Sequence, residues 1–145
     1  MLYLREKIVL AVIRLQKIII SGSISFLGKM KDTANQLMCM GYMVVVPEDV
    51  DWSIIHEVNI NERKKDLSMR YFNEIAKEDT YAVLVVNDMK RGMANYIGAS
   101  TFAEIAVAFY LGKKIFILND IYNPYKYELS AWGVIPLYGR LSGIY

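Results

Sequence analysis

The chain has 145 residues, of which 54% are hydrophobic and 22% are charged, a composition that indicates one folded domain and excludes a disordered or fibrous chain. Its 17 basic and 15 acidic residues leave a net charge of +2, without the basic stripe typical of proteins that bind nucleic-acid polymers. One cysteine, Cys39, and one histidine, His56, exclude an internal disulfide and a Cys/His metal cluster. We expect no cofactor and a reducing compartment, most simply the cytoplasm.

Residues 1–16 carry apolar side chains at helical spacing, interrupted by charged residues such as Arg5 and Arg14. This pattern predicts an amphipathic helix, whereas a membrane span needs about 20 mostly apolar residues. No small-residue cleavage site follows, so a signal peptide is not expected. We interpret the extension as a docking or oligomerisation helix. The alternatives are a helix on a membrane surface and a start codon placed too early.

Residues 17–145 are predicted to be one domain in which strands and helices alternate. Strands are predicted at five short apolar runs: Lys17 to Ile20, Tyr42 to Val46, Tyr81 to Val86, Lys114 to Leu118 and Val134 to Leu137. Helices are predicted at Phe26 to Met40, Asn61 to Lys77, Thr101 to Leu111 and Tyr125 to Trp132. The alternation and the continuous Val/Ile runs predict an α/β fold, a doubly wound five-stranded parallel sheet with helices on both faces.

Ligands of such sheets bind outside the carboxyl ends of the strands. Four segments follow strands and are expected there: Ser21 to Ser25, Pro47 to Trp52, Asn87 to Ser100 and Asn119 to Pro124. Asp88 follows the third strand and belongs to this side, whereas Asp79 precedes that strand. The stretch from Glu48 to Asn61 shows no clear periodicity and is either a mobile loop over the site or an ordinary surface loop.

The turn Ser21-Gly22-Ser23 joins the first strand to a helix. Its glycine lets the backbone approach a ligand closely, and hydroxyls with free N–H groups at a helix start suit a phosphate or sugar hydroxyls. The alternative is a tight structural turn in which Ser23 or Ser25 caps the helix.

Glu104 has two interpretations. Thr101-Phe102-Ala103-Glu104 fits a capping box, in which the carboxylate only satisfies the start of a helix. Alternatively, the helix start lies at the ligand crevice, where the positive end of the helix dipole keeps Glu104 ionised. An ionised carboxylate is the kind of nucleophile that traps an oxocarbenium-like sugar carbon.

Several segments resemble the nucleoside 2-deoxyribosyltransferase superfamily, most closely its small prokaryotic branch. They read KIIISGSISF, VVVPE, AVLVVN and NYIGASTFAEIAVAFYLGKKIFILN. The likeness covers Lys17 to Tyr145, and Asn95 to Asn119 is its most specific part. It implies a flavodoxin-like sheet and an enzyme that cleaves the N-glycosidic bond of deoxynucleosides or, in one branch, of nucleoside monophosphates.

The resemblance also implies roles for single residues. Glu104 matches the nucleophile, which would form a glycosyl-enzyme that water or a second base resolves with retention of configuration. Asp79 matches an aspartate ahead of the third strand, while Asp88 and Asn95 are nearest to the family's helper aspartate. Homo-oligomers with shared sites are common in the family. The candidate catalytic residues are Glu104, Asp88 and Asp79, and the candidate ligand-binding residues are Ser21, Gly22, Ser23, Asn87, Asn95, Gly98, Ser100 and Thr101.

Two other functions stay open. The same fold can hold a nucleotide without turning it over, as a sensor or regulatory module. A phosphoribohydrolase of the related Rossmann-like type would carry a P-G-G-x-G-T-x-x-E pattern, of which only Gly98, Thr101 and Glu104 are present.

Overall fold

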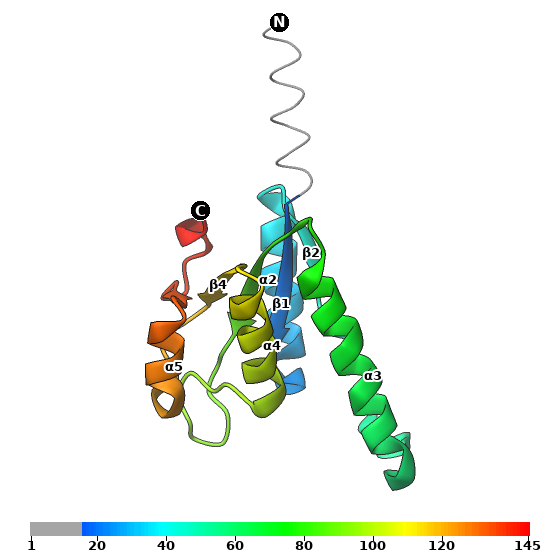
Figure 1. Cartoon of the computed structure of the whole chain (residues 1–145). Coiled ribbons are helices and arrows are strands. Elements are labelled where there is room, and N and C mark those ends of the chain that lie inside the picture. Colours follow the sequence, from blue (N-terminus) through cyan, green and yellow to red (C-terminus); the bar gives the residue numbers. More distant parts are fainter. Residues whose placement is uncertain (1–15) are drawn as a thin grey trace, which may run out of the picture.

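The computed structural model describes residues 16–145, and the predicted helix within residues 1–16 lies almost entirely outside the described part (Figure 1). Strands and helices alternate along the described chain, with three short 3-10 turns between them and a fourth, Leu141–Gly143, after the last strand. The strands are β1 (Lys17–Gly22), β2 (Met43–Val45), β3 (Thr80–Val86), β4 (Lys114–Ile117) and β5 (Ile135–Pro136). The helices are α2 (Leu27–Cys39), α3 (Glu57–Ala76), α4 (Ala99–Tyr110) and α5 (Lys126–Ala131).

The five strands form one sheet in the order β2-β1-β3-β4-β5, and every pair is parallel. This order is that of a flavodoxin-like α/β fold, so the predicted fold class is confirmed. β1 and β3 lie at the centre and pair along most of their length, from Ile18↔Ala82 to Gly22↔Val86. Their apolar side chains are almost entirely buried because both faces of the sheet are covered, which is why the runs read as continuous rather than alternating.

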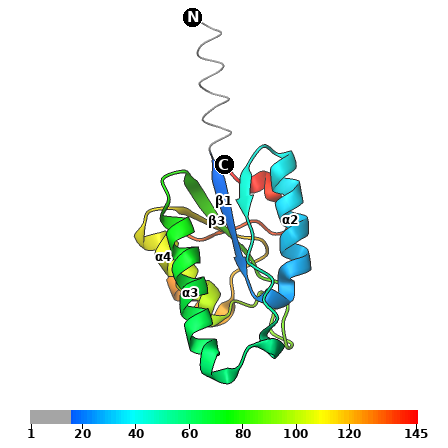
Figure 2. The same ribbon diagram turned by 90° about the vertical axis from the view of Figure 1, so that its right-hand side faces the viewer.

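Helices cover the two faces unequally. α2 packs on one face together with the C-terminal segment, where Phe26, Met30 and Leu37 join the buried side chains of β1 and β3. α3, α4 and α5 cover the other face, where Ile75, Ile105 and Leu129 are buried. Figure 2 shows α2 on one side of β1 and β3, with α3 and α4 on the opposite side.

The long helix α3 positions the candidate site. Among its 20 residues only Ile75, near the C-terminal end, is fully buried against the sheet. Its N-terminal half runs past the carboxyl ends of the strands and away from them (Figure 1). α3 begins at Glu57, four residues before the predicted start. The prediction missed this first turn because Val58 is 84% exposed and adds nothing to the apolar periodicity. The stretch from Glu48 is therefore a shorter connection with one 3-10 turn, Trp52–Ile54.

Within the described residues, no helix has both the length and the apolar character that crossing a membrane requires.

Candidate functional site

A cleft of about 940 Å³ runs along α3, from Glu74 and Lys77 near the start of β1 to the turn after β1 and the start of α4. It is lined from four directions. β1 and its turn contribute Gly22, Ser23 and Ile24; β2 and the following loop contribute Val45, Val46, Pro47, Glu48, Val50 and Trp52; α3 and the residue after it contribute Lys64, Leu67, Ser68, Arg70, Tyr71, Asn73, Glu74 and Lys77; and the β3–α4 connection and α4 contribute Lys90, Tyr96, Gly98, Ala99, Ser100, Thr101 and Glu104. Of the predicted residues, Gly22, Ser23, Gly98, Ser100, Thr101 and Glu104 therefore share one cleft.

Glu104 lies in the second turn of α4, because that helix begins at Ala99 with Gly98 as its N-cap residue. The predicted capping box is therefore wrong: Thr101 is already the third helical residue and is buried, and neither Thr101 nor Glu104 occupies its box position. The Glu104 carboxylate instead accepts a hydrogen bond from the hydroxyl of Ser21, at the end of β1. The Glu104 carboxylate thus contacts β1 and takes no part in capping α4.

Burial raises the pKa of the Glu104 carboxyl to about 7, although the hydrogen bond from Ser21 acts in the opposite direction. The expectation that the helix dipole keeps this group fully ionised is therefore wrong. The dipole acts mainly over the first helical turn, which Glu104 lies beyond, and desolvation of a charge outweighs it. A carboxyl with this pKa is partly ionised near neutral pH, and its ionised form can act as a nucleophile or accept a proton.

Tyr71 of α3 is a site residue that the sequence analysis did not identify. Its phenol donates a hydrogen bond to the carbonyl oxygen of Ile20, next to Ser21 in β1. Burial, and then the nearby charge of Glu104, raise the pKa of Tyr71 well above its usual value, so the phenol stays neutral. β2 pairs with β1 only as far as Val45, and Tyr71 supplies a donor to β1 beyond that point. A tyrosine within an apolar periodic face was the available signal.

The turn after β1 is restricted by close packing at Gly22 and by hydrogen bonds of Ser23. Gly22 has no room for a side chain, since a Cβ there would lie 2.7 Å from the carbonyl oxygen of Val86 in β3. Ser23 does not cap the following 3-10 turn with its side chain; its hydroxyl lies 2.9 Å from that of Ser25 and accepts a hydrogen bond of 2.7 Å from Lys90 Nζ. The glycine is thus required by the close approach of two strands, and Lys90 is a cleft residue that sequence reasoning missed.

Asn87, Asp88 and Asn95 do not line the cleft. Asn87 is buried, donates to the carbonyl oxygen of Asp120 at 2.7 Å and accepts from the backbone N–H of Asn119 at 3.0 Å. The Asp88 carboxylate accepts a hydrogen bond of 3.0 Å from the Asn119 side chain, and the Asn95 side chain accepts one of 3.4 Å from the backbone N–H of Asp120. The three residues tie the ends of β3 and β4 together.

Asp79 lies at the opposite end of the sheet, just before β3. Its carboxylate pairs at 2.9 Å with the ammonium of Lys17, which is itself buried and also contacts Glu74 at 3.2 Å. The hydrogen bond from Lys17 holds the pKa of Asp79 below its usual value. The structure thus does not bring Asp79 to Glu104, and its contacts are those of an ion pair at the start of β1.

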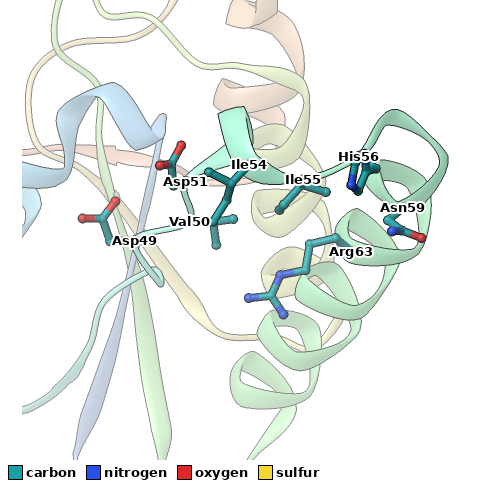
Figure 3. Close-up of a pocket in the computed structure, with 8 residues that line it drawn as sticks. All are labelled: Asp49, Val50, Asp51, Ile54, Ile55, His56, Asn59 and Arg63. Atoms are coloured by element: carbon teal, nitrogen blue, oxygen red, sulfur yellow. The ribbon is translucent and has the colours of Figure 1, made fainter.

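A second hollow, of about 510 Å³, lies between the β2–α3 loop and the start of α3 (Figure 3). Its polar side chains are Asp49, Asp51, His56, Asn59 and Arg63. Asp51 is occupied by hydrogen bonds from Ser53, and Figure 3 shows both aspartates at a distance from His56. Among residues 16–145, no three His, Cys, Asp or Glu side chains are grouped to hold a metal ion.

The flavodoxin-like sheet agrees with the fold that the resemblance implies, but such sheets carry many unrelated activities. Glu104, which the resemblance matches to a nucleophile, is the one candidate catalytic residue that lines the cleft. Comparisons of the chain with protein-family models, with curated proteins and with solved structures found no match.

Proposed function

We propose that the protein binds a nucleoside or nucleoside monophosphate in the cleft and cleaves or transfers its N-glycosidic bond, with Glu104 as the nucleophile. One observation carries the proposal: the Glu104 carboxylate lines the cleft and is held by Ser21, with no part in capping its helix. A carboxylate that no structural task occupies, in a crevice at the carboxyl end of a parallel sheet, is placed for chemistry on a ligand.

The reaction has two displacements. A Glu104 oxygen bonds to the anomeric carbon as the bond from that carbon to the base nitrogen breaks, and the base leaves with that electron pair and takes a proton from solvent in the cleft. Water or a second base then attacks the same carbon, the bond from that carbon to the Glu104 oxygen breaks, the proton lost by the attacking group passes to solvent, and the Glu104 carboxylate is regenerated. Two inversions retain the configuration of the sugar. The hydrogen bond from Ser21 fixes the orientation of the carboxyl group for the first step.

Aromatic side chains from two different segments of the cleft lining suit the flat base. Trp52, from the β2–α3 loop, is half-buried in the lining, and the ammonium of Lys64 lies 6.0 Å from its ring centroid. Tyr96, from the β3–α4 connection, also lines the cleft, and its ring is held edge-on by Tyr122 at 5.7 Å between centroids. Stacking on aromatic rings binds any base, so these residues support a nucleobase ligand without selecting one.

A binding module without turnover is the second candidate. It is favoured by the position of Asp88, whose carboxylate is bonded to Asn119 outside the cleft and so does not face the leaving base. Incubation with a panel of nucleosides and their 5′-monophosphates, followed by chromatography of the released base, separates the two functions. Base release supports the glycosidic reaction, whereas ligand binding without base release moves the assignment to a binding module.

The proposed nucleophile predicts a pH dependence. Only the ionised carboxylate attacks, so kcat/KM is expected to fall about tenfold per pH unit below about 7 and to level off above it. Ser21→Ala removes the hydrogen bond that lowers the pKa of Glu104, and should move this acid limb to higher pH. Ser25→Ala, which removes an exposed hydroxyl bonded only to Ser23, is the control and should leave the limb in place. A pH profile that does not respond to Ser21→Ala would contradict the assignment.

We also propose that the chain forms a homodimer or a larger homo-oligomer through α4 and α5. Trp132 stacks on Phe102 and on Phe109, with ring centroids 5.3 Å apart in both pairs, and Phe109 is 46% exposed. An aromatic surface of this kind is favourable to cover with a second copy. Light scattering is expected to give at least twice the monomer mass, and Phe109→Glu should shift the species toward the monomer. A stable monomer at working concentration would refute the proposal.

A further inference from the structure

A short hairpin in the β3–α4 connection carries Lys90. Lys90 and Met93 form an antiparallel bridge in which each backbone N–H donates to the other's carbonyl, at 3.0 and 2.9 Å. The two residues between them, Arg91 and Gly92, have φ angles of 50° and 76°. Positive φ at both central positions is typical of the tightest hairpin turn. The backbone of Lys90 is thus fixed by local structure at the edge of the cleft.

The side chain of Lys90 is also fixed. Its ammonium donates to the Ser23 hydroxyl at 2.7 Å and lies 5.2 Å from the centroid of the Tyr96 ring. Both contacts are with neutral groups. Among the residues that the structure describes, no carboxylate lies within ion-pair distance of Lys90. The lysine therefore brings an uncompensated positive charge to the cleft.

Other basic residues of the cleft lining are used differently. Arg70 pairs with Glu48 at 2.9 Å, and Lys77 pairs with Glu74 at 2.6 Å, so both have a carboxylate partner. Lys64 is exposed and sits over Trp52, on the α3 side of the cleft. Of these four side chains, only Lys90 donates a hydrogen bond to the turn that follows β1. The last residues of β1 include Ser21, which donates a hydrogen bond to Glu104.

The first residues of α4 line the same cleft as Lys90. The N-cap residue of this 12-residue helix is Gly98, which has no side chain to satisfy the first backbone N–H groups. Free N–H groups at a helix start favour an anion, and a fixed ammonium in the same cleft adds a full charge to that preference. The ammonium of Lys90, and not the helix start alone, distinguishes this part of the cleft from an ordinary strand-to-helix turn.

We infer that Lys90 is a specificity-determining residue that selects a 5′-phosphorylated sugar over the same sugar without phosphate. The inference rests on the proposed function for the identity of the sugar ligand. Ser23, which holds Lys90, lies two residues beyond Ser21, which holds Glu104; two residues of extended chain span about 7 Å. A furanose can bridge this separation with its anomeric carbon at Glu104 and its 5′ substituent at Lys90.

The test uses sugars without a base, so that it does not depend on base preference or turnover. Binding of 2-deoxyribose 5-phosphate and of 2-deoxyribose to the full chain is measured by calorimetry, together with the ribose pair and inorganic phosphate. We expect the phosphorylated sugar to bind at least about tenfold more tightly than the free sugar, with a preference that weakens as salt is added. Lys90→Gln should remove most of this preference, and Lys90→Arg should keep it.

Lys126→Gln is the matched control, because Lys126 also lies over a tyrosine ring, 5.1 Å from the centroid of Tyr127, but on α5 outside the cleft lining. It should leave the preference unchanged. Equal binding of both sugars by the wild type, or the same preference in Lys90→Gln as in the wild type, would overturn the inference. If nucleotides are bound but no base is released from any of them, the catalytic proposal fails while the selection by Lys90 stands. Base release that is equally fast from nucleosides and their 5′-monophosphates would support the catalytic proposal and contradict the selection by Lys90.

Discussion

Glu104→Gln is expected to reduce base release by a factor on the order of 10³ or more, because a neutral amide cannot form the ester with the anomeric carbon. Ligand binding should be nearly unchanged, since glutamine keeps the size of the side chain and can still accept a hydrogen bond from Ser21. The measurement is release of base under single-turnover conditions, with calorimetric binding of the same ligand recorded for both proteins.

The same variant has a predicted effect on stability that depends on pH. The folded-state pKa of Glu104 is raised from 4.5 to about 7, so the folded protein binds more protons than the unfolded chain between these values. Ionisation of Glu104 therefore costs the wild type stability as the pH rises through that window. Relative to the wild type, Glu104→Gln should gain about 2 kcal/mol in free energy of unfolding between about pH 5 and about pH 8.

Glu128→Gln serves as the control for both measurements, because Glu128 is exposed on α5 and lies outside the cleft lining. It should change neither base release nor the pH dependence of stability. Wild-type turnover by Glu104→Gln would end the nucleophile proposal. A difference in stability between the wild type and Glu104→Gln that is the same at both pH values would show that the Glu104 carboxyl is not desolvated in the folded protein.

Gly22→Ala is expected to lower the free energy of unfolding by about 3 kcal/mol, which is large for the addition of one methyl group. The new Cβ would lie 2.7 Å from the carbonyl oxygen of Val86 and 3.2 Å from the sulfur of Met30. The methionine side chain can move, but the Val86 oxygen belongs to the backbone of a central strand that pairs on both sides. Relief therefore requires separation of β1 from β3 at the cleft. Urea denaturation of both proteins gives the difference.

Gly28→Ala is the matched control for this substitution. Gly28 is an exposed residue of α2, and a Cβ built there meets nothing within 4 Å. Alanine favours the helix more than glycine does, so this variant should gain up to about 1 kcal/mol. Equal effects of the two substitutions would mean that Gly22 is not confined by β3.

Most of the fold could be predicted from the sequence, because it follows from local patterns. Apolar runs such as those around Ile18 and Val83 are buried on both faces, and this burial is visible as continuous hydrophobicity. Gly41 and Gly112, with φ angles of 96° and 71°, follow α2 and α4, and a glycine just beyond the last helical residue is typical of a helix end. Signals at the N-terminal ends were weaker. α3 and α4 begin four and two residues before the predicted starts, because exposed first turns add nothing to the periodicity.

The candidate site could be predicted only in part. The rule for carboxyl ends of parallel strands correctly brought the turn at Ser23 and the helix start at Gly98 into one cleft. The same rule included Asn87 and Asp88. Both residues lie at that edge of the sheet, but their side chains accept hydrogen bonds from Asn119, just beyond β4, and do not line the cleft. The position of a residue along a strand does not determine which residue of a neighbouring segment its side chain contacts.

Sequence alone determined the alternation of strands and helices, the parallel sheet and the edge at which the turn after β1 and the start of α4 meet, because each depends on residues close together in the chain. Tertiary structure decided the chemistry of that edge. Ser21 meets Glu104 across 83 positions of sequence, and Tyr71 reaches Ile20 across 51. The choice between cap and buried carboxyl for Glu104, like the charge that Lys90 brings to the cleft, depends on such distant partners. Burial and electrostatic energy follow from distances in space, which the spacing of residues along the chain does not record.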